Sequence, residues 1–109
     1  MTRLCFALDL KDDPSLISAY EAYHKKVWPE ILESLKAAGI LELEIYRAGN
    51  RLFMIMETSE NFSLEKKSIR DAADLKVQEW ERLMWTYQQA LPGSMPGEKW
   101  VLMKNIFAL

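Results

Sequence analysis

The chain has 109 residues, of which 50% are hydrophobic and 28% are charged, and its formal net charge is −2 at pH 7. This length and composition predict one domain, residues 1–109, with a single modest core, and they exclude a disordered chain. The slightly acidic balance argues against a nucleic-acid partner, and no apolar run reaches the roughly 18 residues that a membrane span needs.

The start of the chain and its cysteine content indicate the compartment. Cys5 is the single cysteine and cannot form a disulfide within the chain. No group of Cys and His residues has the spacing of a zinc site. The first residues enter an alternating pattern directly, without the apolar run and cleavage site of a signal peptide. We therefore expect a cytoplasmic protein.

The first third of the chain predicts a strand followed by a long helix. Apolar residues alternate with other residues over 4–10, which is typical of a strand. Asp13 before Pro14 is a helix start signal, and an apolar stripe at about 100° per residue then runs over 16–38. Gly39 is a natural helix end.

The middle of the chain predicts a hairpin and then a short helix. Alternating stretches at 41–46 and 52–57 lie on either side of a turn at Gly49, as in two antiparallel strands. The polar stretch that follows predicts a short helix after Ser59, with a break near residues 71–74.

The last third predicts a second helix, a connector and a final strand. A helical stripe runs from 77 to 91, a stretch rich in Pro and Gly covers 92–97, and an almost continuous apolar run follows at 100–107. Such a run is typical of a strand covered on both faces. The order is βαββαβ, the pattern of a ferredoxin-like α+β fold. One face of such a sheet is bare, so we expect a homodimer to which the last strand contributes.

The first predicted helix carries the candidate chemistry. Tyr20, His24 and Trp28 follow one another at steps of four, which places them in a slowly turning column on the helix. His24 is the only histidine, and histidine is the side chain that exchanges protons near neutral pH. Pro29 disfavours an uninterrupted helix and predicts a kink or a restart, which would widen a pocket beside this column. Spacing alone is more typical of a surface or partly packed histidine, with aromatic neighbours in the core or at an interface, than of a catalytic group.

A longer sequence motif that contains these residues resembles that of a known family. The first helix reads Tyr20-x-x-x-His24-x-x-x-Trp28-Pro29-Glu30 after an N-terminal strand, and Trp80 lies in the later helix. Over nearly its whole length, the chain resembles the L-rhamnose mutarotase family. The resemblance implies a dimeric α+β barrel that interconverts the α and β anomers of a 6-deoxy hexose and needs no cofactor.

The resemblance also implies roles for individual residues. His24 matches the proposed proton donor, and Tyr20 matches a tyrosine that contacts the sugar. Trp80 and Glu81 occupy the positions of a sugar-contacting tryptophan pair. Leu43 falls where the family has a further tyrosine and cannot donate a hydrogen bond. These departures favour L-fucose as an alternative substrate to L-rhamnose.

The sequence leaves the roles of three tryptophans and the identity of the catalytic base open. Trp28 and Trp80 are expected to wall the sugar pocket, and the base that would complement His24 has three candidates. These candidates are Glu30, Glu57 and Glu81. Trp85 lies off the apolar stripe of its helix, which favours a contact with a partner subunit over a place in the sugar site.

Fold alone does not decide function, and two rival classes share this architecture. The first is a monooxygenase-like protein without cofactor, or a haem-related protein. The second is a small-ligand binding module without catalytic activity. Acceleration of anomer exchange would distinguish a mutarotase from both.

Overall fold

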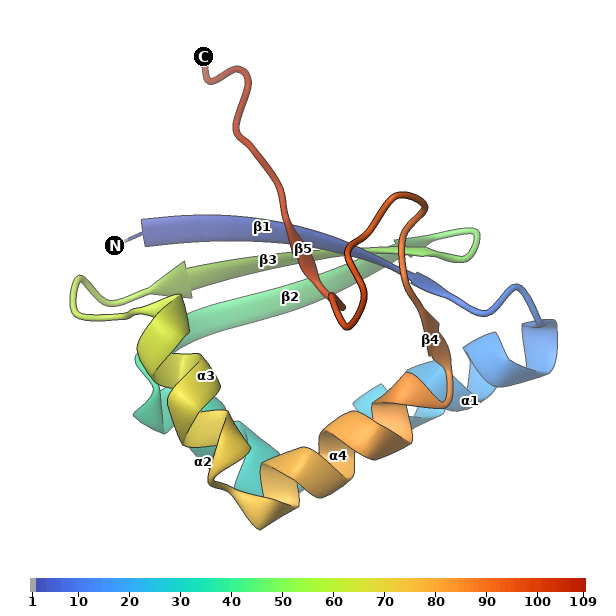
Figure 1. Cartoon of the computed structure of the whole chain (residues 1–109), viewed down its shortest axis with the longest axis horizontal. Coiled ribbons are helices and arrows are strands. Elements are labelled where there is room, and N and C mark those ends of the chain that lie inside the picture. The colour runs from blue at the N-terminus through green and yellow to red at the C-terminus, as the bar shows by residue number, and fades with distance from the viewer. Residues whose placement is uncertain (1) are drawn as a thin grey trace.

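A computed structural model describes residues 2–109 and has two layers, a sheet and a set of helices that covers one of its faces (Figure 1). The elements in chain order are β1 (Thr2–Leu10), α1 (Pro14–His24), α2 (Pro29–Ala37), β2 (Ile40–Ala48), β3 (Arg51–Thr58), α3 (Leu64–Ala72), α4 (Leu75–Trp85), β4 (Gln88–Gln89) and β5 (Val101–Leu102). None of the helices in this described range has the length and apolar content needed to cross a bilayer.

The sheet is antiparallel and has the order β2-β3-β1-β4, with β5 also paired to β1. This is the strand order of a ferredoxin-like α+β fold, so the predicted fold class is confirmed. The predicted hairpin is also present, because β2 pairs with β3 and Gly49 supplies a positive φ of 60° in the turn.

The side chains of the sheet alternate between its two faces. Along β3, Leu52, Met54 and Met56 are buried against the helices, whereas Phe53 and Ile55 between them are half-buried on the other face. A period of two along a strand produces this division. The helix-facing side chains belong to the hydrophobic core, together with residues of α1, α2 and α4.

The segment predicted as one long helix forms two. α1 ends at His24, and α2 begins at Pro29. Trp28 is extended, with φ −57° and ψ 135°, as expected for a residue before proline. The predicted restart at Trp28-Pro29 is therefore confirmed.

Two helix starts are held by aspartate side chains. Asp13 accepts hydrogen bonds from the backbone N–H groups of Ser15 and Leu16, at 2.9 and 3.2 Å, and so caps α1. Asp74 caps α4 in the same way. The predicted break near residues 71–74 is thus the junction between α3 and α4.

The C-terminal run corrects one prediction. Only Val101 and Leu102 pair with β1, and the Met103 N–H donates to the Cys5 carbonyl at 2.8 Å. The rest of the predicted strand leaves the sheet on the side away from the helices (Figure 1), with Ile106 88% and Phe107 75% exposed. The prediction of a strand covered on both faces was wrong for the residues after Met103, because the chain turns away from the edge of β1 there and ends on the open side of the sheet. The short strand β4 has no alternating pattern and was not predicted.

The cap of α1 makes a testable contribution to stability. The hydrogen bonds from Ser15 and Leu16 lower the pKa of Asp13, so its contribution is present at neutral pH and is lost as the pH falls through that lowered value. We expect Asp13→Ala to lower the unfolding temperature by a few degrees at pH 7, and by much less in acid. Asp12→Ala is the matched control, since it removes the same charge from an exposed neighbour. Equal losses in the two variants, measured by thermal unfolding, would contradict the cap.

Candidate functional site

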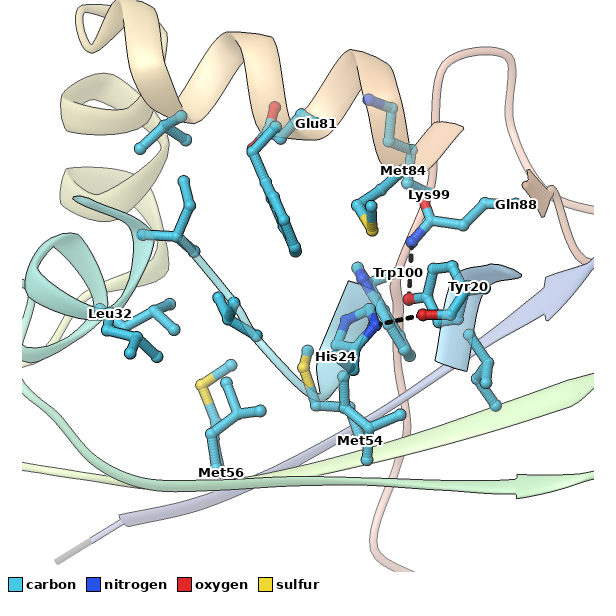
Figure 2. Close-up of a pocket in the computed structure, with 18 of the residues that line it drawn as sticks. Tyr20, His24, Leu32, Met54, Met56, Glu81, Met84, Gln88, Lys99 and Trp100 are labelled. Carbon is cyan, nitrogen blue, oxygen red and sulfur yellow. Dashed lines mark hydrogen bonds between the residues drawn. The ribbon is translucent and has the colours of Figure 1, made fainter. Parts of the chain in front are cut away.

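A cavity of about 890 Å³ lies between the sheet and the helices (Figure 2). Its volume is in the range of small-molecule sites, about 300–1,000 Å³. The lining comes from elements that are far apart in the sequence, including α1, β3, α4, β4 and the segment before β5. Residues that represent them are Tyr20, His24, Met54, Trp80, Gln88 and Trp100.

His24 stands at the wall of the cavity as the last residue of α1. Its Nδ1 lies 2.9 Å from the backbone carbonyl oxygen of Tyr20. A carbonyl oxygen can only accept a hydrogen bond, so Nδ1 carries a proton in this arrangement. The remaining ring nitrogen, Nε2, is therefore the atom that can take up or release a proton.

Tyr20 lies one helical turn before His24 and is 3% exposed. The centroids of the two rings are 4.5 Å apart. The Tyr20 hydroxyl accepts a hydrogen bond from Gln88 Nε2 at 3.1 Å (Figure 2). Burial raises the pKa of Tyr20, and the hydrogen bond from Gln88 opposes part of that rise. The phenol is consequently neutral at physiological pH and keeps its proton.

Aromatic rings form the wall beside this pair. The Trp80 ring is buried, with its centroid 5.8 Å from that of His24 and 5.0 Å from that of Trp28. Trp80 lines the cavity, whereas Trp28 packs against Trp80 and is not among the lining residues. Lys76 Nζ lies 5.5 Å from the Trp28 centroid. The predicted wall is therefore built by Trp80 with Trp28 supporting it, and a sugar contact by Trp28 itself stays a prediction.

The three candidate bases are placed differently. Glu81 lines the cavity, and its Oε2 lies 3.4 Å from Gln78 Nε2. Glu57 instead forms an ion pair with Arg3 at 3.1 Å, and neither it nor the exposed Glu30 lines the cavity. Among these three carboxylates, Glu81 alone is positioned to act inside the cavity.

Several lining residues were not predicted. Gln88 and Trp100 come from the C-terminal part of the chain, and Lys67 and Asp71 add an ion pair from α3. Gln88 falls within the stripe predicted as helix from 77 to 91, and that prediction was wrong at its end, because α4 ends at Trp85 and Gln88 lies on β4. Trp100 was expected to begin a strand, and its side chain reaches the cavity instead.

Trp85 is 37% exposed, and Lys99 Nζ lies 5.3 Å from the centroid of its ring. The Lys99 side chain, from the segment before β5, therefore lies near this ring. Trp85 is not among the residues that line the cavity. Its contact with a partner subunit remains a prediction.

Comparisons with known proteins agree with this geometry. The sequence model of the L-rhamnose mutarotase family matches residues 3–109. The chain is 54% identical, over 111 residues, to the L-fucose mutarotase of Xanthomonas campestris pv. campestris, which covers 100% of this chain and 89% of that protein.

Two solved structures have the same fold. The L-rhamnose mutarotase FA22100 of Formosa agariphila has a TM-score of 0.73 at 24% identity and covers 100% of this chain and 99% of its own. A dimeric ferredoxin-like protein from an uncultured marine organism has a TM-score of 0.54 at 13% identity, covering 98% of this chain and 90% of its own. At these identities the structures show the fold, and the sequence match shows the family. The chain belongs to the L-rhamnose mutarotase family, whose members are isomerases that act on sugars.

Proposed function

We propose that this mutarotase interconverts the α and β anomers of L-fucose and that His24 transfers the proton at the ring oxygen. The observation that carries the proposal is the position of the His24 ring, at the wall of a cavity of small-molecule size, with Nδ1 held by a backbone carbonyl. That bond leaves Nε2 as the atom that can meet a substrate.

The reaction needs two proton transfers. The ring oxygen gains a proton while the anomeric hydroxyl loses one, and the bond from C1 to the ring oxygen breaks to give the open-chain aldehyde. Rotation about the C1–C2 bond presents the other face of the carbonyl, and the ring closes with both proton transfers reversed. The protonated His24 ring donates from Nε2 to the ring oxygen. Its Nδ1–H bond to the Tyr20 carbonyl suits both the charged and the neutral ring, so the ring need not move during the cycle.

The second group in this scheme is Glu81. A carboxylate accepts the proton of the anomeric hydroxyl when the ring opens and returns it when the ring closes. Glu81 is half-buried and lies on α4, one residue after Trp80, which packs against His24. The two proposed proton carriers therefore lie on different helices that face the same cavity.

The walls of the cavity suit a 6-deoxy sugar. Tyr20 and Trp80 offer aromatic surface to the apolar C–H face of a pyranose, and Met54 and Met56 offer apolar surface from the sheet. A methyl group at C6 needs an apolar neighbour, because its burial removes hydrocarbon from water.

Two observations favour L-fucose over L-rhamnose. The chain is 54% identical to an L-fucose mutarotase, against 24% for the L-rhamnose mutarotase of known structure. Leu43 lines the cavity and cannot form the hydrogen bond that the family resemblance assigns to a tyrosine at this position. The two sugars differ in configuration at C2 and C4, so the loss of one hydrogen-bonding side chain changes which of them fits.

The outer face of the sheet supports a homodimer. Cys5, Phe53 and Ile55 form a half-buried apolar strip there, and the apolar Ile106 and Phe107 extend from the same side. Apolar surface that is contiguous and exposed is typical of an interface. One of the fold neighbours is described as dimeric, and a second copy of this chain would cover both features.

Substitution of His24 tests the mechanism. We expect His24→Asn and His24→Gln to slow anomer exchange by about 10²–10⁴-fold, the usual contribution of acid–base catalysis. The two amides place a neutral group near Nδ1 and near Nε2 respectively, and neither can carry the proton. Exchange is measured by saturation-transfer NMR, with circular dichroism to confirm folding. A folded variant with native activity would eliminate His24 as the proton carrier.

A comparison of substrates tests the sugar assignment. We expect L-fucose to exchange about five- to tenfold faster than L-rhamnose at equal concentration, since one hydrogen bond is worth about 1 kcal/mol. Polarimetry of freshly dissolved single anomers gives the rates. Faster exchange of L-rhamnose would reverse the assignment while leaving the reaction class intact.

Oligomeric state tests the role of the tail. We expect the native chain to sediment as a dimer and Ile106→Asp to shift it toward the monomer, because a buried unpaired carboxylate is costly. Ile69→Asp is the matched control, since Ile69 is 66% exposed on α3, on the helical side of the molecule. A monomeric native chain in sedimentation velocity would refute the dimer.

A further inference from the structure

Gln88 is a buried polar residue that the reaction described above does not use. It is 6% exposed and lies on β4, where its backbone pairs with Leu10 of β1. We propose that Gln88 is a positioning residue that fixes the Tyr20 hydroxyl as a hydrogen-bond donor to the bound sugar. This inference rests on the proposed function and deepens it.

The position of Gln88 depends on a two-residue ladder. Asp9 pairs with Gln89 and Leu10 with Gln88, and the Lys11 N–H donates to the Tyr87 carbonyl at 2.9 Å. These contacts anchor β4 to the end of β1 beside α1. The amide of Gln88 is thereby placed against Tyr20, a residue 68 positions away in the chain.

The polarity of this hydrogen bond decides what the phenol can do. The Gln88 Nε2–H group donates, so the Tyr20 oxygen accepts in this contact. The phenol keeps its own proton, since burial raises the pKa of Tyr20. Both side chains line the cavity (Figure 2), so the O–H group is free to donate to an oxygen of a ligand there.

Tyr20 then contributes to the site twice. Its carbonyl oxygen holds Nδ1 of His24, and its hydroxyl, held by Gln88, meets the sugar. The rings of Tyr20 and His24 are 4.5 Å apart between centroids. A sugar oxygen bound to the Tyr20 hydroxyl therefore has a defined position relative to Nε2 of His24. Misplacement of a reacting group by about 1 Å can cost a factor of about 10² in rate.

A double-mutant cycle tests whether Gln88 acts through Tyr20. We expect Gln88→Met, which keeps the length of the side chain and removes its donor, to slow anomer exchange about tenfold, with most of the loss in kcat. In a Tyr20→Phe background the same substitution should have no further effect, because the hydroxyl that it positions is gone. Gln89→Met is the matched control at the exposed neighbouring position and should retain the native rate.

A second test reverses the direction of the hydrogen bond between residue 88 and Tyr20. In Gln88→Glu the ionised carboxylate would accept the phenol proton and turn it away from the sugar, whereas the protonated carboxyl group can still donate. We expect exchange by this variant to fall more steeply with rising pH than exchange by the native chain or by Gln89→Glu, in which His24 alone supplies the pH dependence. Native rates in Gln88→Glu at every pH, or additive losses in the cycle, would overturn the inference.

The hydrogen bond itself can be tested without sugar. Denaturant unfolding of the native chain, Gln88→Met, Tyr20→Phe and the double variant should show midpoint shifts that are not additive. Additive midpoints would refute the contact between the two side chains. If the native chain failed to exchange any 6-deoxy hexose, the proposed function would fail, while this measurement would still decide whether Gln88 holds Tyr20.

Discussion

Pro29 is the constraint on which the site depends. A proline in the interior of a helix removes one hydrogen bond and clashes with the carbonyl four residues earlier, at a cost of about 3 kcal/mol. The chain avoids this cost by ending α1 at His24 and beginning α2 at Pro29, with Trp28 extended between them. His24 consequently occupies the end of a helix, beside the cavity, where its ring bonds back to the carbonyl of Tyr20.

The aromatic wall around His24 stabilises this arrangement. Trp80 is in edge contact with Tyr23, His24 and Trp28, at centroid distances between 5.0 and 6.3 Å. Such pairs contribute about 0.5–1.5 kcal/mol each beyond their burial. The contacts join α4 to both parts of the interrupted helix. The cavity is therefore held open by packing between its walls, and the groups that face it are preorganised.

The two faces of the sheet serve different purposes. The helix-facing side supplies the apolar floor of the cavity through Met54 and Met56. The other side carries the half-buried strip of Cys5, Phe53 and Ile55 and the departing C-terminal tail. A chain of 109 residues has too few elements to cover both faces of its sheet. The cavity of the candidate site lies on the face that the chain covers itself.

Local features of this protein could be read from the sequence. The strand at 4–10, the hairpin around Gly49, the cap at Asp13 and the interruption at Pro29 all depend on residues within a few positions of one another, so their patterns predicted them. The motif from Tyr20 to Glu30 also indicated the family, because its residues lie close together in the sequence.

Tertiary structure alone decided the rest. The contact of Gln88 with Tyr20 joins residues 68 positions apart, and Trp28 lies behind Trp80 because of the way α4 packs on the interrupted helix. The apolar run at 100–107 has the composition of a strand, yet it pairs with β1 only at Val101 and Leu102 and then leaves the sheet. A strand needs a partner as well as a pattern, and the position of that partner depends on the packing of the whole chain.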